Sequence, residues 1–507
     1  MKHTIVILLA ISFVHCSGKD AQAPVEKSTA AEEPAAPDKA ALPEQEAAPD
    51  PAAAKGEELV LISPGEMAAL EGKLMERVGA NQVAKCPRPV LRGNPTAGPA
   101  DDDIHQLLGP GNATVMECLT HIEKTPDIDA YLESPVESLA DTVAQAQKLC
   151  APVAPLLAAA VQHEDACSPY LAGRKGHPHL IRLIRLSKAV ALLMERLSLL
   201  GHPAKAVELG LDLLVLSQDI SRGGASLICA MVGVATSQIT TLRGIRTVLN
   251  ATDHLAAEQL TSLMAQVDRL IAAEPTFGSF WDYERVGFAL MSILPGIKPE
   301  GWVPPGGWDE GTNWDPAAGA LGESIEGVST QQQYGLVLLA ADRSFRLLSS
   351  ACPEGTAPIP CHEALEKAGK ENANKATDDK FARTFKTLLS QQPTEEIRAW
   401  ILDILSAVAT PAFNKYVVRY ANRMQNYVAV RSHLAIIAFR LEQGRCPAKG
   451  DFKTDARLSA ALLEPWSNDS MTVTVKDAGR ITLTAPAAYA HFKDDRTAQE
   501  YLIQCTP

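Results

Sequence analysis

Acidic and aromatic side chains gather in one Gly/Pro-rich segment, residues 295–320. The residues with chemical potential are Trp302, Trp308, Trp314, Asp309 and Asp315. Flat indole faces can pack on sugar rings, and carboxylates can bind Ca²⁺ or act as a general acid and base. The carboxylate spacing does not follow the EF-hand pattern. We therefore expect a loop fixed to the core by its own tryptophans, and a binding loop is the alternative.

No other motif in the chain assigns a reaction. Trp281, Asp282, Glu284 and Arg285 fall on one expected helix, where an ion-pair set on its surface explains them better than acid-base catalysis. The histidines never form His-x-x-x-His with a partner glutamate, and no Cys-x-x-Cys, Gly-x-Ser-x-Gly or Gly-rich phosphate loop occurs. The sequence thus leaves catalytic residues unknown and predicts no metal and no cofactor.

Ten cysteines are the most informative residues of the chain. In an exported protein most of them should be paired. We expect Cys352 and Cys361 to be joined across a short Pro/Gly-rich loop, and Cys229, inside an apolar run, to be free. The six remaining candidates are Cys446 and Cys505, which bracket the C-terminal module, and the leftover pairs Cys150 with Cys167 and Cys86 with Cys118. Eight cysteines allow 105 connectivities.

The first sixteen residues resemble a bacterial lipoprotein signal. Lys2 precedes an apolar run, Ile5 to Val14, which ends just before Cys16. A run this short cannot span a bilayer, which needs roughly 20 residues, but it suits a signal-peptide core. The resemblance implies that Cys16 carries lipid, although His15 departs from the small residue usual at that position. Cleavage after Ala23, which would release a secreted chain, is the alternative.

Residues 17–57 consist almost entirely of Ala, Pro, Glu, Asp, Lys and Gln. Such a composition cannot bury enough apolar surface to offset its ordering entropy, so we expect a disordered linker. The expected divisions of the chain are a signal peptide 1–16, the linker 17–57, a helical domain 58–424 and a C-terminal module 425–507.

The composition of the whole chain favours helices and excludes one class of partner. Lys and Arg number 47 against 60 Asp and Glu, a formal charge of −13. An acidic chain lacks the basic surface of a nucleic-acid binder. Aromatic residues are only 5%, and abundant Ala and Leu favour helices over strands.

Periodicity then predicts a mainly α fold of antiparallel helical hairpins in one large body. The expected helices are 58–79 with Gly79 as C-cap, a helix from 177 that ends at the break Gly201-His202-Pro203, one after that break, a core helix over 225–236, and 255–273, 277–294, 323–350 and 394–443. Residues 87–99 should be irregular. Met471–Val475 and Ile481–Thr484 alternate around a turn and predict a small β-hairpin.

Three motifs follow one another near the C-terminus: a helix end at Phe439 to Gly444, then Cys446-Pro447, then Glu464-Pro465-Trp466. They resemble a module of uncharacterised exported helical proteins of planctomycetes and deltaproteobacteria, whose pattern is a helix ending in Tyr-Arg-Leu-x-x-Gly, then Tyr-Pro, then a DPW-like turn. Cys446-Pro447 stands for Tyr-Pro, and Glu464-Pro465-Trp466 stands for the DPW-like turn. The upstream helices resemble the same proteins, and the resemblance implies an exported helical protein with no known activity.

These observations lead to one expectation and one alternative. We expect an exported envelope lipoprotein, anchored to the inner or outer membrane, that binds or scaffolds a protein or an envelope polymer. The alternative is a hydrolase of envelope polymer that uses carboxylates near the Trp-rich loop 300–315.

Overall fold

The structure is a computed structural model of the 507-residue chain. It describes residues 61–83, 88–93, 96–99, 107–109, 111–125, 127–165, 180–222, 227–252, 255–274, 330–353, 356–375, 395–396, 398–399, 413–476, 479–489 and 500–505. Within these ranges it is mainly helical, as predicted, with a small antiparallel sheet near the C-terminus. The predicted signal, the linker 17–57, the helix 277–294 and the Trp-rich loop lie outside the described residues.

The predicted hairpin after residue 177 is formed by two helices of equal length. They are α8 (Leu180–Leu199) and α9 (Pro203–Arg222). The link between them is short because Gly201, at φ +80°, closes a Schellman turn. In that turn the Gly201 N–H bonds to the Ser198 carbonyl at 2.9 Å, and the His202 N–H bonds to the Leu197 carbonyl at 2.9 Å. Pro203 then begins α9, where its missing N–H costs nothing.

A third long helical stretch packs on this hairpin. It consists of α10 (Leu227–Ile239), the π-helical turn η3 (Thr240–Ile245) and α11 (Arg246–Asn250). The apolar run predicted as a core helix forms most of α10. Among the described residues no helix is long and apolar enough to cross a membrane. The π-helical turn was not predicted; Thr240 and Thr241 bond there to the carbonyls of Thr236 and Ser237.

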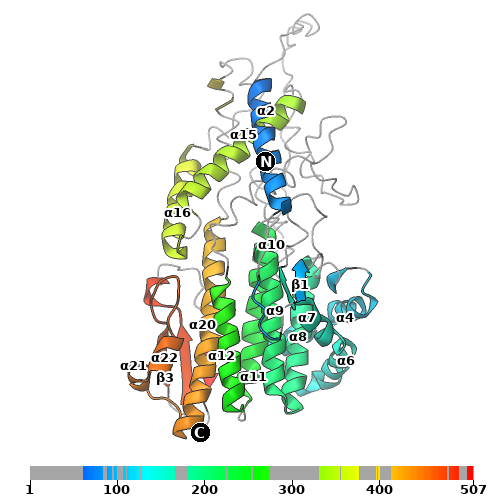
Figure 1. Ribbon diagram of the computed structural model, residues 1–507, viewed down its shortest axis with the longest axis vertical. Helices are drawn as coiled ribbons and strands as arrows, with labels where there is room; N and C mark the ends of the chain where they lie inside the picture. Colours follow the sequence, from blue (N-terminus) through cyan, green and yellow to red (C-terminus); the bar gives the residue numbers. More distant parts are fainter. Residues whose placement is uncertain are drawn as a thin grey trace, which may run out of the picture. The chain divides into compact units, whose positions relative to one another are not determined.

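The longest described helix, α20 (Phe413–Gln443), packs against several other helices of the body. Figure 1 shows it running beside α12 (Ala257–Ala272). It contacts α10, α12 and α16 (Pro358–Lys375), and most of its residues from Tyr416 to Phe439 are buried. Gly444 ends it as predicted, with its N–H bonded to the Arg440 carbonyl at 2.8 Å. The division expected between residues 424 and 425 therefore falls inside one continuous helix.

Short helices before the hairpin pack on α8. They are α4 (Ala113–Lys124), α5 (Asp127–Glu133), α6 (Ala140–Cys150) and α7 (Val153–Ala160), with the 3-10 turn η2 (Glu137–Leu139) before α6. Asn112 caps α4 by accepting a hydrogen bond from the Val115 N–H. Lys188 on α8 pairs with Asp129 on α5 at 2.7 Å, which ties α5 to α8.

Two expectations for the N-terminal part of the body were wrong. The first helix, α2, spans Pro64–Val83 and continues through Gly79, so that glycine is not a cap. Residues 87–99 are not wholly irregular, because β1 (Thr96–Pro99) pairs in parallel with β2 (His163–Asp165). A parallel pair joins segments far apart in sequence, which local turn signals cannot reveal.

The helix α15 (Thr330–Ala351) packs against α2, the first described helix of the body. Gln332, on α15, accepts hydrogen bonds from the Leu61 and Ile62 N–H groups at 2.8 Å each. Its amide nitrogen donates to the Ile62 carbonyl at 3.0 Å. One buried glutamine thus fixes the backbone that leads into α2.

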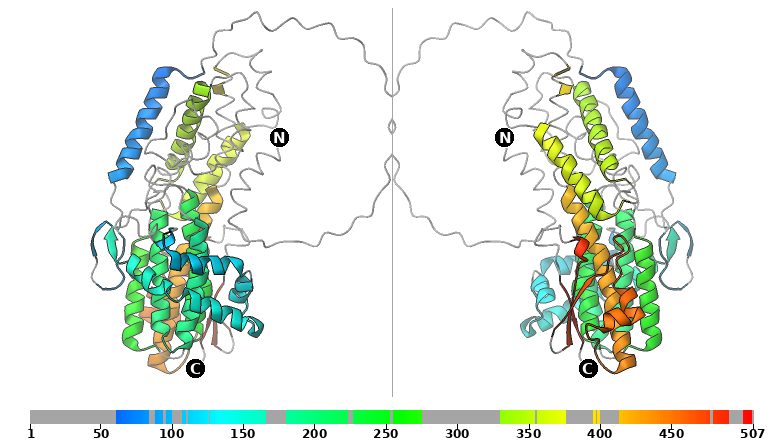
Figure 2. Two further views of the ribbon diagram at one scale, coloured as in Figure 1. Left: turned by 90° about the vertical axis from the view of Figure 1, so that its right-hand side faces the viewer. Right: turned by 90° about the vertical axis from the view of Figure 1, so that its left-hand side faces the viewer.

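The C-terminal module contains the predicted hairpin and one strand more. After α21 (Asp451–Thr454) and α22 (Ala456–Ala461), β3 (Thr472–Lys476) pairs antiparallel with β4 (Arg480–Thr484). The strand β5 (Tyr501–Gln504), which was not predicted, pairs antiparallel with β4, so that β4 is the central strand of the sheet. The 3-10 turn η8 (Ala487–Tyr489) lies between β4 and β5 in the sequence. Gly479, at φ +74°, is required because a Cβ there would lie 2.0 Å from the Cys505 carbonyl oxygen. Figure 2 shows this sheet beside α20.

Candidate functional site

The predicted binding residues Trp302, Trp308, Trp314, Asp309 and Asp315 lie outside the described residues, as does the lipid-attachment candidate Cys16. The features of the described body that could form a site are its disulfides, its buried charges and a surface groove.

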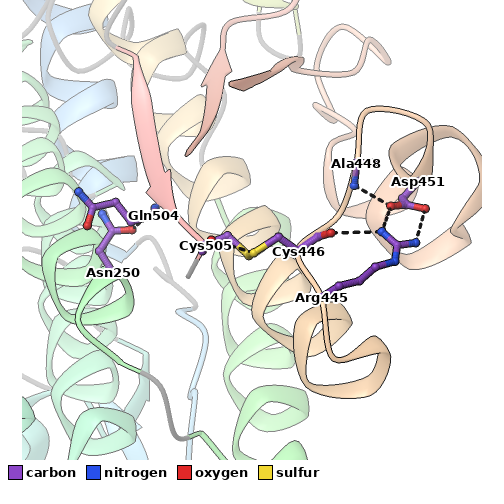
Figure 3. Close-up of a disulfide and its surroundings, with 7 residues drawn as sticks. All are labelled: Asn250, Arg445, Cys446, Ala448, Asp451, Gln504 and Cys505. Atoms are coloured by element: carbon purple, nitrogen blue, oxygen red, sulfur yellow. Dashed lines mark hydrogen bonds and ion pairs between the residues drawn. A yellow bond between two sulfur atoms is a disulfide. The ribbon is translucent and has the colours of Figure 1, made fainter. Parts of the chain in front are cut away.

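Three disulfides are formed within the described residues. Cys352–Cys361, which joins the end of α15 to α16, is confirmed. Cys446–Cys505, which links the turn after α20 to the end of β5, closes the C-terminal module as its bracketing position indicated (Figure 3). Asn250, at the end of α11, also holds β5. Its side-chain amide donates to the Leu502 carbonyl at 3.1 Å, and its side-chain oxygen accepts from the Gln504 N–H at 2.8 Å.

The third disulfide corrects an expectation. Cys118 on α4 pairs with Cys150 on α6, with their Cα atoms 4.9 Å apart. The expected pairs Cys150–Cys167 and Cys86–Cys118 are therefore wrong; Cys86 and Cys167 themselves lie outside the described residues. The reason is tertiary: α4 and α6 pack against each other on α8, which places both sulfurs in the core, whereas the expected pairs were those left over once the other cysteines had been assigned.

Two arginines attach an extended segment, residues 88–92, to one face of α9. The Arg88 guanidinium donates to the Asp219 carboxylate at 2.8 Å, and neither side chain is exposed to solvent. Arg92 pairs with Asp212 and lies 3.8 Å from Glu208. Asp212 and Asp219 are seven residues apart, two helical turns, so the segment follows the helix axis in the opposite direction.

Burial raises the pKa of Asp212 to about 6, and the nearby Arg92 guanidinium offsets part of this rise. A carboxyl group with a pKa near neutrality is a candidate general acid. However, Asp212 does not line the groove described next, and its hydrogen bond to Arg92 gives it a structural role. We interpret this pair as the attachment point of the 88–92 segment.

A groove of about 510 Å³ lies between the 88–92 segment and the outer face of α12. Leu91 forms one side, and α12 forms the other with Glu258, Thr261, Ala265 and Arg269. The Arg269 guanidinium donates to the carbonyls of Val90 at 3.4 Å and Leu91 at 2.9 Å, which holds the two sides together. The volume falls in the range of ligand sites, roughly 300–1,000 Å³.

Gln266 lines the same groove and is 2% exposed. Its amide nitrogen donates to the Ser262 hydroxyl at 3.2 Å, and its amide oxygen has no donor among the described residues. A buried acceptor without a donor costs free energy, because it has lost its hydrogen bond to water. Gln266 therefore holds an unsatisfied acceptor in the wall of the groove.

A second polar cluster is buried between α9, α12 and α20. Arg423 forms an ion pair with Glu274, and its guanidinium donates to the Ser221 hydroxyl at 2.6 Å. Gln218 donates to Glu274 at 2.7 Å. The Arg423 guanidinium also lies 5.1 Å from the centre of the Tyr420 ring. These groups pair with one another beneath the surface, and only the Arg423 Nε among their guanidinium and carboxylate atoms lacks a partner in the described residues, so we assign the cluster to the stability of the body.

The motif Glu464-Pro465-Trp466 joins this cluster. The Glu464 carboxylate accepts the N–H groups of Trp466 at 3.0 Å and Ser467 at 2.8 Å, and the Tyr489 hydroxyl at 3.0 Å. Trp466 stacks on Tyr420 with ring centroids 5.3 Å apart. The Glu464-Pro465-Trp466 motif thus fixes a turn against α20.

Within the described ranges no group of three or more His, Cys, Asp or Glu side chains could hold a metal ion. Searches with protein-family models, among curated proteins and among solved structures find no match to this chain. The candidate site is therefore the groove along α12.

Sequence reasoning missed the groove and the buried charges for different reasons. The sequence does indicate the buried charges Asp212, Asp219 and Arg423, since a charged residue inside an otherwise apolar helical face implies a buried partner. No sequence pattern indicates the groove, because Leu91 and Ala265 come together only when the chain folds.

Proposed function

We propose that this chain is an exported, lipid-anchored envelope protein whose helical body binds another molecule. The observation that carries the proposal is the set of three disulfides in the described body. Disulfides of this kind form and persist in oxidising compartments and are rare in the cytosol. They agree with an apolar run that ends at Cys16 and fits a lipoprotein signal.

Lipid on Cys16 would provide the anchor. The two or three acyl chains of a bacterial lipoprotein bury many CH₂ groups at roughly 0.8 kcal/mol each, enough for stable membrane attachment. The acidic chain, with a formal charge of −13, gives little electrostatic attraction to anionic lipid. Attachment should therefore depend on this single sulfur.

Binding is favoured over catalysis because three buried carboxylates are already paired with arginines. Asp212 and Asp219 form ion pairs with arginines of the 88–92 segment, and Glu274 forms one with Arg423. The groove along α12 is the surface feature with the dimensions of a ligand site. The function that fits these features is recognition of an envelope component close to the membrane.

The test is detergent phase partitioning together with the intact mass of the mature chain. We expect wild type in the detergent phase, with a mass that starts at a lipid-modified Cys16. Cys16→Ser should move the chain to the aqueous phase or leave it unprocessed, and Ser17→Ala, which keeps the sulfur, should behave as wild type. A mature chain that starts at Pro24 and stays aqueous would show simple secretion and would overturn the anchor.

A further inference from the structure

The groove along α12 carries charges of opposite sign at its two ends. Glu258 lies in the first turn of α12, and Arg269 lies in the last. Eleven residues separate them, which is about 16 Å at 1.5 Å per residue. Between them the α12 side is formed by short side chains, among them Thr261 and Ala265. A ligand that satisfied both ends would need a positive and a negative group about 16 Å apart.

The middle of the groove supplies hydrogen-bonding groups. The Gln266 amide oxygen lies in the groove wall and lacks a donor among the described residues, and a turn of its side chain toward the groove would let a ligand N–H complete it. The exposed Ser262 hydroxyl can donate to a ligand carbonyl, whereas the Thr261 hydroxyl already donates to the Ala257 carbonyl at 2.9 Å. The apolar wall is Leu91. A peptide, which carries N–H and C=O groups between two charged ends, matches these groups better than a neutral glycan, which has no charged ends.

We propose that the groove binds a short peptide in an extended conformation, with its amino end at Glu258 and its carboxyl end at Arg269. The proposal rests on the proposed binding function and names its ligand class. Five extended residues span about 16 Å at roughly 3.3 Å each, which equals the separation of the two charges. Short side chains on α12 leave room for the peptide backbone to approach the helix.

The probe is the pentapeptide Lys-Ala-Ala-Ala-Glu with free termini, titrated by calorimetry into the full chain carrying Cys16→Ser. We expect saturable one-to-one binding with a submillimolar Kd. The reversed peptide, Glu-Ala-Ala-Ala-Lys, should bind at least about threefold more weakly, because its side-chain charges face like charges in the groove. Equal affinity for both peptides would overturn the assigned direction, and no saturable binding of either would overturn the site.

A matched pair of variants tests the location. Ala265 lines the groove, whereas Ala272 is exposed on the same helix outside it. Ala265→Trp should fill the groove and weaken peptide binding at least about tenfold, and Ala272→Trp should leave it unchanged. Unaltered binding by Ala265→Trp would overturn the proposal. Lipid attachment is measured separately on the wild-type chain, so absence of peptide binding to the Cys16→Ser chain, with wild type still in the detergent phase, contradicts this inference alone.

Discussion

Arg423 on α20 and Glu274, just beyond α12, form an ion pair in which neither side chain is accessible to solvent. Removing a carboxylate and a guanidinium from water is costly, and their attraction repays this only where further hydrogen bonds complete both groups. Here Gln218 donates to Glu274, and the guanidinium of Arg423 donates to Ser221. The pair therefore fixes how α9, α12 and α20 pack together. Removing one partner leaves the other charge buried without a counter-ion.

We predict that Arg423→Met lowers the free energy of unfolding by about 3–5 kcal/mol, because Glu274 would remain buried without its partner. The double variant Arg423→Met/Glu274→Gln should recover part of this loss. Urea unfolding measures both. The control is Arg457→Met, which breaks an ion pair with Glu442 whose side chains are 32% and 57% exposed; it should cost less than about 1 kcal/mol. Similar losses in the two single variants would contradict the assignment.

Asp212 should make stability depend on pH between about 4 and 6. Its ordinary pKa is 3.8, and burial raises the folded-state value to about 6. A carboxyl group whose pKa is higher in the folded state stabilises the fold at low pH, and this contribution is lost as pH rises through the folded-state pKa. The full effect is at most about 3 kcal/mol.

Asp212→Asn should therefore be less sensitive than wild type to a rise in pH from 4 to 7. The difference in urea midpoint between the two proteins should move in favour of the variant as pH increases. Glu208→Gln, which changes a more exposed partner of Arg92 on the same helix, serves as the control: it removes only a minor contribution to the raised pKa of Asp212, so most of the pH dependence should remain. A difference that stays constant across this range would show that Asp212 titrates normally.

His433 should act in the opposite direction. Burial lowers its pKa from 6.5 to about 3, and the positive charges of Arg246 and Arg440 add to this effect. A histidine whose pKa is lower in the folded state stabilises the fold above its unfolded pKa, and stability is lost as pH falls below 6.5. The loss is at most about 1.4 kcal/mol per pH unit down to about pH 3.

His433→Phe removes the titrating group and keeps an aromatic ring facing Tyr501, which lies at 5.8 Å between ring centroids. At pH 7 the variant should be about 1 kcal/mol less stable, because the Tyr501 hydroxyl loses its partner at 3.3 Å. At pH 4.5 the gap should close or reverse. Thermal unfolding at the two pH values measures this, and parallel curves for variant and wild type would refute it.

The three disulfides should rank by the length of chain that they close. Their separations are 59 residues for Cys446–Cys505, 32 for Cys118–Cys150 and 9 for Cys352–Cys361. The chain-entropy estimate gives contributions of about 4.3, 3.7 and 2.7 kcal/mol. Double Cys→Ala variants, unfolded in urea with a reducing-agent control, should follow this order. The largest loss in the Cys352–Cys361 variant would show that native packing, not loop closure, sets the ranking.

The sequence by itself predicted the elements that depend on local patterns. Gly201 and Pro203 define the turn between α8 and α9, and Gly444 defines the end of α20, because backbone sterics act within a few residues. The alternation around Gly479 likewise predicted the hairpin of β3 and β4. The short loop between Cys352 and Cys361 made their pairing predictable as well.

Only the tertiary structure decided which distant residues meet. Cys118 pairs with Cys150 because α4 and α6 pack together, and β1 pairs with β2 across more than sixty residues. The groove is formed by Leu91 and α12, whose contact has no sequence period. Local sequence patterns predict which face of a segment is buried. Which other segment covers that face depends on packing and charge pairing in the whole body, as between Arg92 and Asp212.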